Sequence, residues 1–328
     1  MHQVGPVGGH AAQTVHHHDV GLVRRRVGAS DEELEAVDHL EAALQHRGVK
    51  DLVGAHRPRL RRASRCAAST VRAMDLVTLE EAGGVATVVL RRTDRLNSLN
   101  HAMIAELGVA LADGAARNRV VVLRAEPGVK VFSAGHDLDD VPVHADPAEW
   151  DNPVEAVIAG IPELPAPVVA AVEGTVWGAA CNLVVACDLI VAVRTATFAI
   201  TPAKLGVPYF PAGVEIFARS LPLHVVKAMF FTAEPITAER AHGFGMVHSL
   251  ADDGADLQRQ VERITGRIAA LAPLTIRSVK AELAAVGREP EDERAELEAM
   301  RRAAWQSADV QEGVQAFRER RAPVFEGR

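Results

Sequence analysis

The spacing of hydrophobic positions predicts a run of strands after residue 74. Residues 76–80 and 85–90 alternate or run apolar as strands do, and Gly83-Gly84 between them is typical of a hairpin turn. Uninterrupted apolar runs of strand length then follow, which favour strands buried on both faces. These runs are residues 120–123, 167–172 and 189–193.

Helical spacing separates these strands and then takes over the chain. One helix is expected to end near Asn118 and another to span residues 178–187, so strands and helices alternate. This alternation predicts an α/β fold with buried parallel strands. Beyond Pro211 the pattern becomes almost entirely helical, with helices expected at about residues 211–231, 237–243, 257–272, 274–286 and 291–305.

Residues 1–73 differ in composition from the rest of the chain. They contain no Phe, Tyr or Trp, hold eight of the fourteen histidines and carry a net charge of +3, against −10 in the remainder. Such a segment has little to offset its ordering entropy. We therefore predict a poorly ordered extension with one marginal helix over residues 32–44. The alternative is that translation starts at Met74 and that the upstream residues are an artefact of start-site choice. The run His16-His17-His18 is more typical of a solvated tract than of a metal site.

Composition narrows the classes of function. The net charge of −7 argues against a nucleic-acid partner, and the sequence holds no apolar run long enough to span a membrane. Three cysteines are too few for a disulfide framework or a four-thiolate zinc site, so we expect a cytoplasmic protein without a metal centre. Motifs of nucleotide-binding loops, zinc proteases and serine hydrolases are absent from the sequence.

Two segments place small residues where a predicted strand ends, Lys130–Leu138 and Glu173–Asn182. Small residues let a ligand approach the backbone, and N–H groups at the start of a helix have no intrahelical acceptor. Two such donors that converge on one point form an oxyanion hole. Each segment alone is more typical of tight packing, but together they predict a site.

With Arg92-Thr93-Asp94-Arg95-Leu96-Asn97-Ser98-Leu99-Asn100, these segments make the chain resemble the crotonase superfamily, also called the enoyl-CoA hydratase/isomerase family. The resemblance runs from Asp75 to the C-terminus. It implies a ββα spiral core, assigned to residues 74–265, and a helical C-terminal oligomerisation region at 266–328 that forms homotrimers or homohexamers.

The resemblance also implies an acyl-CoA thioester as substrate, with no separate cofactor because CoA is part of that substrate. The thioester oxygen would be held by the backbone N–H groups of His136 and Ala179. The family commonly has Gly where Ala179 stands, and the alanine methyl narrows the pocket.

The residues at the family's acid and base positions restrict the reaction. Hydratases of the family use two glutamates, which fall at Asn182 and Pro202 here, and neither of these residues transfers a proton as a carboxylate does. Decarboxylation of a 2-carboxyacyl-CoA needs a stabilised enolate but no general base.

The segments Thr201–Tyr209 and Ile236–Ala241 resemble the decarboxylase branch of the family, which converts methylmalonyl-CoA to propionyl-CoA. This resemblance implies His136, Ala179 and Tyr209 as catalytic residues. The substrate- and CoA-binding residues expected beside them are Arg95, Leu96, Ser98, Ala134, Asp137, Leu138, Gly178, Asn182 and Pro202.

Two alternatives remain open from the sequence. One is another crotonase reaction, such as hydration or hydrolysis of an unusual acyl-CoA. The other is a catalytically silent acyl-CoA binder, which Ala179, Asn182 and Pro202 together favour.

Overall fold

The computed structural model describes residues 69–140, 152–206, 209, 211–286 and 291–328. All of them belong to one compact unit, Cys66–Arg328. The predicted extension up to residue 68, with its helix over 32–44 and the histidine run 16–18, lies outside the described residues.

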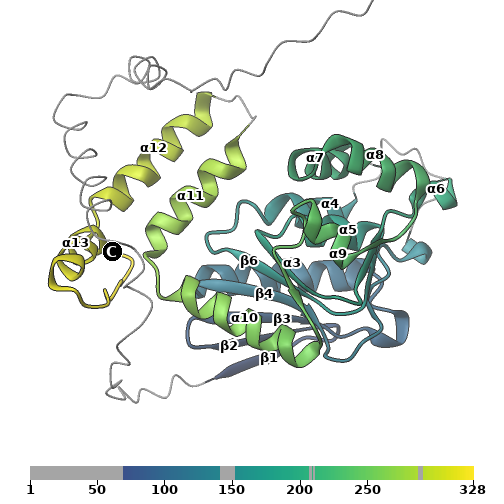
Figure 1. The fold of residues 1–328 in the computed structure, drawn as a ribbon, viewed down its shortest axis with the longest axis horizontal. Helices are drawn as coiled ribbons and strands as arrows, with labels where there is room; N and C mark the ends of the chain where they lie inside the picture. Colours follow the sequence, from purple (N-terminus) through teal and green to yellow (C-terminus); the bar gives the residue numbers. More distant parts are fainter. Residues whose placement is uncertain (1–68, 141–151, 207–208, 210, 287–290) are drawn as a thin grey trace, which may run out of the picture. The chain divides into compact units, whose positions relative to one another are not determined.

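A seven-stranded sheet forms the centre of this unit (Figure 1). Its first three strands are antiparallel and β3 onward is parallel. The apolar runs predicted the parallel strands at its centre, but not the last strand, residues 249–251. Thr70–Ala73, which the sequence assigned to the extension, pairs with the next strand as the edge of the sheet. In spatial order the strands are β1 (Thr70–Ala73), β2 (Val77–Ala82), β3 (Val85–Leu90), β4 (Val120–Ala125), β6 (Val168–Val172), β8 (Leu189–Val193) and β11 (Ser249–Ala251).

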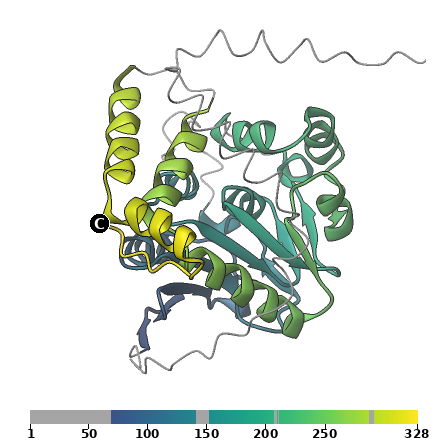
Figure 2. The same ribbon diagram turned by 60° about the vertical axis from the view of Figure 1, so that its left-hand side comes forward.

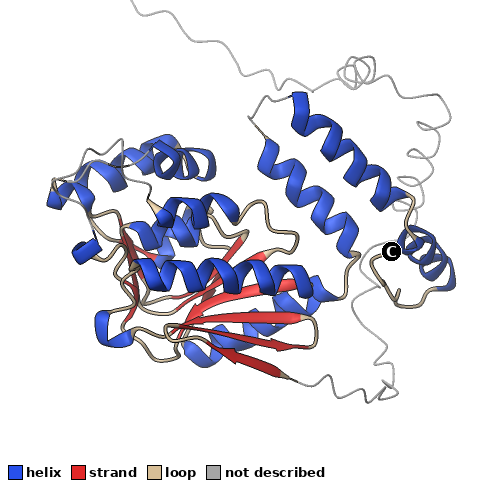
Figure 3. Cartoon of the chain, turned by 180° about the vertical axis from the view of Figure 1, so that it is seen from behind, coloured by secondary structure: helices blue, strands red, loops and turns tan. Residues whose placement is uncertain are grey.

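Helices cover both faces of this sheet, which explains why its parallel strands are apolar without alternation. Helix α3 (His101–Arg117) packs on one face, where Gly114 lies against Ala86 and Val121. Helix α10 (Gly254–Ala269) covers the other face, where Arg124 donates to Gln258 at 2.6 Å. Figures 1 and 3 show the two helices on opposite sides of the strands.

A second, four-stranded sheet holds shorter strands that the hydrophobic pattern did not reveal. Its order is β10-β9-β7-β5, and β5, β7 and β9 are parallel. Because these strands are parallel, their carboxyl ends meet at one edge, where ligands bind in open α/β sheets. The strands are β5 (Val131–Ser133), β7 (Thr175–Trp177), β9 (Thr197–Ala199) and β10 (Ile236–Thr237).

Helices dominate the rest of the chain, as predicted (Figure 2). The single helix expected over 211–231 is two helices, because Pro222 caps the second one and cannot continue the first. Helices α4 and α6 were not expected from the sequence, whereas α13 lies in the region 266–328 that the resemblance implied to be helical. The helices beyond α3 and α10 are α4 (Pro153–Gly160), α5 (Ala179–Val185), α6 (Pro202–Leu205), α7 (Pro211–Ser220), α8 (Leu223–Thr232), α9 (Ala238–Gly243), α11 (Pro273–Ala285), α12 (Glu291–Trp305) and α13 (Ala308–Glu319).

An ion pair between a buried lysine and a partly exposed aspartate joins the C-terminal helices to the sheet. Lys280 of α11 reaches Asp188 Oδ2 at 2.7 Å and the Ala166 carbonyl at 3.1 Å. The same Asp188 oxygen accepts the N–H of Val168 at 2.6 Å. Helix α10 itself runs across the boundary that the sequence placed between residues 265 and 266. Among the described helices, none has the length and apolar character needed to cross a membrane.

Candidate active site

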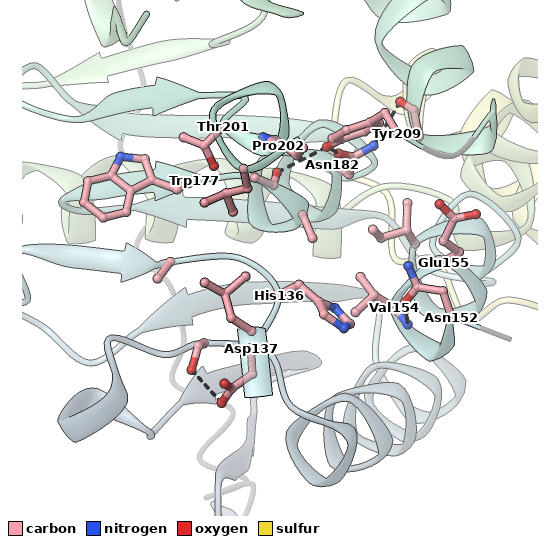
Figure 4. A pocket seen from close by; sticks show the side chains of 18 of the residues that line it. His136, Asp137, Asn152, Val154, Glu155, Trp177, Asn182, Thr201, Pro202 and Tyr209 are labelled. Carbon is pink, nitrogen blue, oxygen red and sulfur yellow. Dashed lines mark hydrogen bonds between the residues drawn. The ribbon is translucent and has the colours of Figure 1, made fainter. Parts of the chain in front are cut away.

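A cavity of about 600 Å³ opens at the carboxyl ends of β5, β7 and β9 (Figure 4). Helices α4 and α7 supply its other wall. All predicted site residues except Leu96 line it, so segments far apart in the sequence meet here. Those residues are Arg95, Ser98, Ala134, His136, Asp137, Leu138, Gly178, Ala179, Asn182, Pro202 and Tyr209.

The two small-residue turns touch each other at this cavity through their backbones. Gly135 has a φ of +86°, and a Cβ built on it would lie 2.5 Å from the Trp177 carbonyl oxygen and 3.0 Å from the Ala179 nitrogen. No side chain fits in that space, and the left-handed conformation also favours glycine. The sequence pattern predicted this meeting of the turns, and the structure places them in contact.

Backbone hydrogen bonds hold the turn of His136 against the preceding loop. The Leu99 N–H donates to the Gly135 carbonyl at 2.8 Å, and the Asp137 N–H donates to the Leu99 carbonyl at 3.1 Å. The Ala134 N–H donates to the Leu96 carbonyl at 2.9 Å. Leu96 therefore supports the turn through its backbone, while its side chain is 49% exposed outside the cavity lining.

Arg92, the first residue of the motif Arg92–Asn100, forms an ion pair that the sequence did not predict. Its Nη1 lies 2.5 Å from Asp137 Oδ2 and 2.7 Å from Ser98 Oγ, and Ser98 Oγ donates to Asp137 at 3.0 Å. The guanidinium holds the pKa of Asp137 below its usual value. The polar atoms of Asp137 and Ser98, predicted as binding groups, are thus used to fix the loop. Forty-five residues separate Arg92 from Asp137, so no local pattern could reveal the pair.

His136 lies at the lower edge of the cavity in Figure 4. Burial lowers the pKa of its imidazole, with Asp140 and Asp137 opposing that shift and His101 adding to it. The neutral ring is therefore the favoured form near pH 7.

Tyr209 and Asn182 form a small network at the top of the cavity in Figure 4. The Asn182 Nδ2 donates to the Gly213 carbonyl at 2.9 Å, which fixes the orientation of the amide and leaves its Oδ1 toward Tyr209. The Tyr209 hydroxyl donates to that oxygen. Burial raises the pKa of the phenol, so it stays protonated. The close fit also excludes a side chain at Gly213, whose Cβ would lie 2.8 Å from Asn182 Nδ2.

Glu155 is a further cavity residue that sequence reasoning missed. It belongs to α4, whose first turn is capped by Asn152, the acceptor of the Val154 N–H at 3.2 Å. Burial raises the pKa of Glu155. An Asn-Pro start followed by Glu is a helix signal that could have found α4, although nothing in it points to the cavity. Thr201, Lys204 and Ile158 also line the cavity without having been singled out.

The nearby cysteine does not supply a nucleophile. Cys181 is fully buried, and burial raises its pKa to about 12. Its thiol donates to the Val176 carbonyl at 3.0 Å. Within the described ranges, no three His, Cys, Asp or Glu side chains gather as a metal site would require.

With this geometry established, comparison with known proteins identifies the family. The model of the enoyl-CoA hydratase/isomerase family matches residues 80–328. The chain belongs to the enoyl-CoA hydratase/isomerase family. This confirms the resemblance seen in the sequence, and the solved relatives confirm the crotonase-type α/β fold.

The relatives of this chain within the enoyl-CoA hydratase/isomerase family carry the names of different reactions. The chain is 38% identical to the methylmalonyl-CoA decarboxylase of Escherichia coli, over 77% of this chain and 98% of that protein. It is 30% identical to the 1,2-epoxyphenylacetyl-CoA isomerase of Escherichia coli, over 78% of this chain and 100% of that protein. A crystal structure of methylmalonyl-CoA decarboxylase with 2S-carboxypropyl-CoA matches with a TM-score of 0.64 at 37% identity, covering 78% of this chain and 100% of that one.

Proposed function

We propose that this chain decarboxylates a 2-carboxyacyl-CoA, with methylmalonyl-CoA as the first candidate and propionyl-CoA as product. The observation that carries the proposal is the contact between Gly135 and the backbone of Trp177 and Ala179 at the cavity. The similarity to methylmalonyl-CoA decarboxylase supports the choice of substrate.

In this reaction the backbone N–H groups of His136 and Ala179 would act as the oxyanion hole. The bond from C2 to the carboxylate breaks, CO₂ leaves, and the electron pair passes into the thioester enolate. The two donors stabilise the charge that develops on the thioester oxygen. A proton added to C2 then gives the product.

The acyl side of the cavity suits this step. Val154 and Ile158 are buried apolar side chains of α4 that line it. A carboxylate loses hydration in such surroundings, whereas neutral CO₂ loses little. The Tyr209 hydroxyl can move its hydrogen bond from Asn182 to the substrate carboxylate and so fix the angle of the bond that breaks.

The proposal gives the other lining residues supporting roles. Arg95 and Lys204 are cationic and line the cavity, so we assign them to the phosphates of CoA. Ala134, Leu138, Gly178 and Pro202 shape the path of the thioester arm. No further cofactor enters this scheme, because CoA belongs to the substrate.

We also propose that the chain assembles into homotrimers or homohexamers through its C-terminal helices. Large apolar side chains are exposed there, among them Leu283 on α11, Trp305 on α12 and Phe317 on α13. Exposed apolar groups of this size mark association surfaces when they gather. Light scattering after size exclusion measures the assembly directly; a monomer at micromolar concentration would contradict the proposal.

The decisive assay incubates the protein with methylmalonyl-, ethylmalonyl- and malonyl-CoA and follows CO₂ and the acyl-CoA product by mass spectrometry. We expect propionyl-CoA from methylmalonyl-CoA without an added cofactor. Hydration of crotonyl-CoA with no CO₂ release would favour another reaction of the family. Tight binding of CoA esters without turnover of any of them would identify a silent binder.

A further inference from the structure

The cavity contains one carboxyl group whose role is not accounted for. Three acidic side chains line it, namely Asp137, Asp139 and Glu155. Asp137 is occupied by Arg92, and Asp139 is exposed to solvent. Glu155 is half-buried, and no side chain or backbone group that the structure describes makes a hydrogen bond or ion pair with its carboxyl group.

The surroundings of Glu155 favour its protonated form. The residue before it, Val154, and Ile158 one turn later are buried apolar side chains. Tyr209 is near enough that a negative charge on Glu155 raises the pKa of the phenol further. A carboxyl group with apolar neighbours and no cationic partner keeps its proton to higher pH than an exposed glutamate does.

Glu155 lines the same cavity as His136 and Ala179, whose N–H groups are assigned to the thioester oxygen. Figure 4 shows Glu155 on the α4 wall, across the cavity from Trp177, Thr201 and Pro202. Ala179, two residues after Trp177, contributes the N–H assigned to the thioester oxygen. The proton transfer proposed below requires the α-carbon of a substrate held there to lie toward Glu155.

We propose that Glu155, in its carboxylic acid form, delivers the proton to the α-carbon after CO₂ has left. This inference rests on the decarboxylation proposed above. The O–H bond of Glu155 breaks and the C2–H bond forms, with the electron pair of the enolate supplying the new bond. Glu155 is left as a carboxylate and takes up a solvent proton before the next turnover.

Besides the three carboxyl groups, the polar groups near the thioester site include Tyr209, Asn182 and His136, which are poorer acids. Tyr209 holds its proton more firmly than a free phenol does, because burial raises its pKa. Asn182 has no ionisable proton, and the neutral imidazole of His136 is a very weak acid. Glu155 combines a labile proton with a place in the cavity, which is what a general acid requires.

The test follows the configuration of the product formed in D₂O, which a structural role would not change. Decarboxylation of methylmalonyl-CoA in D₂O gives propionyl-CoA with one deuterium at C2, and delivery from one wall gives one configuration. The variants are Glu155→Gln, which has no ionisable proton, and Glu155→Asp, which keeps a carboxyl group on a side chain one methylene group shorter. Glu80→Gln removes an exposed carboxyl group on β2, away from the cavity, as the matched control.

We expect the wild type and Glu80→Gln to give a single configuration. Glu155→Gln should give a mixture of the two configurations at C2 and turn over about 100-fold more slowly. Glu155→Asp should recover part of the rate and part of the preference for one configuration. In the wild type, kcat should fall as pH rises through the raised pKa of Glu155, and Glu155→Gln should lose that dependence. Binding of propionyl-CoA, measured by calorimetry, should change little and shows that the variant is folded.

Two results would overturn the inference. One is Glu155→Gln turning over at the wild-type rate with the wild-type configuration, and the other is a mixed configuration from the wild type itself. In both cases CO₂ is still released, so decarboxylation stands while the role of Glu155 fails. Absence of CO₂ from the wild type would instead refute the proposed function.

Discussion

The two walls of the cavity are built in different ways. The wall that carries His136 is fixed by backbone hydrogen bonds from Leu99 and by the Arg92–Asp137 ion pair. The opposite wall, with Glu155 and Tyr209, has one short network through Asn182, and most of its other lining side chains are apolar. Under the proposed function, the wall of His136 would bind the thioester group that all substrates share, and the wall of Glu155 and Tyr209 would select the acyl group.

This contrast predicts different effects from substitutions on the two walls. Changes on the wall of His136 should reduce turnover of every acyl-CoA, and some should also reduce stability. Changes on the wall of Glu155 and Tyr209 should leave the fold intact and alter which substrate reacts and how the proton is added.

The largest effect is expected from Gly135→Ala. The new Cβ would meet the Trp177 carbonyl oxygen at 2.5 Å and would also disfavour the φ of +86°, so the two turns must separate. Loss of an oxyanion donor costs about 100- to 1000-fold in kcat, and we expect a loss of that size. Turnover of methylmalonyl-CoA measures it. The control is Gly243→Ala on α9, where the added Cβ has open space; equal losses in both variants would contradict the proposed contact.

Asp137→Asn is expected to lower the free energy of unfolding, and this should be its main effect. The Arg92 and Asp137 side chains are only 14% and 13% exposed, so removing the negative charge leaves a nearly buried cation. We expect about 3 kcal/mol less unfolding free energy in urea. Glu126→Gln breaks the exposed pair with Arg91 and should cost less than about 1 kcal/mol.

The same pair gives a pH prediction. The folded pKa of Asp137 lies below its unfolded value, so its contribution is present above about pH 4 and is lost as pH falls through the folded pKa. The stability difference between wild type and Asp137→Asn should therefore shrink below about pH 4. A difference that stays constant down to pH 2 would show that the pair is not the cause.

On the wall of Glu155 and Tyr209, Tyr209→Phe should affect substrate choice while preserving the fold. The edge-to-face contact with Phe230, at 4.8 Å between ring centroids, remains, but the hydrogen bond to Asn182 is lost. We expect about 1 kcal/mol less stability and about tenfold lower kcat/KM for 2-carboxyacyl-CoA esters. The affinity for propionyl-CoA, which lacks the carboxylate, should be unchanged. If that affinity also falls about tenfold, Tyr209 contributes only packing and does not contact the substrate carboxylate.

The smallest effect is expected from Ala179→Gly. Removing this methyl group widens the cavity beside the thioester site while keeping the backbone N–H. We expect ethylmalonyl-CoA to gain relative to methylmalonyl-CoA by less than about tenfold, as one methylene group allows. Competition between the two esters, followed by mass spectrometry, measures the ratio; no change would mean that Ala179 does not contact the acyl group.

The sequence predicted five of the seven strands of the large sheet, because its central parallel strands are apolar runs buried between α3 and α10, but it did not predict the edge strands β1 and β11. It did not reveal β5, β7 and β9, since strands of three residues are too short for a hydrophobic period to appear. The motifs at their ends nevertheless predicted which residues line the cavity. Arg92 and Glu155 were missed because their roles depend on contacts between distant segments.

The ion pair of Lys280 with Asp188 affects how the chain unfolds. Detaching α11 from the core would leave the carboxylate of Asp188 without its cation and loosen the first residues of β6 and β8. The C-terminal helices and the large sheet should therefore open together, as one cooperative unit in native-state hydrogen exchange. In Lys280→Met the amides of α11 should exchange through a separate, lower-energy opening while those of β4 keep their protection.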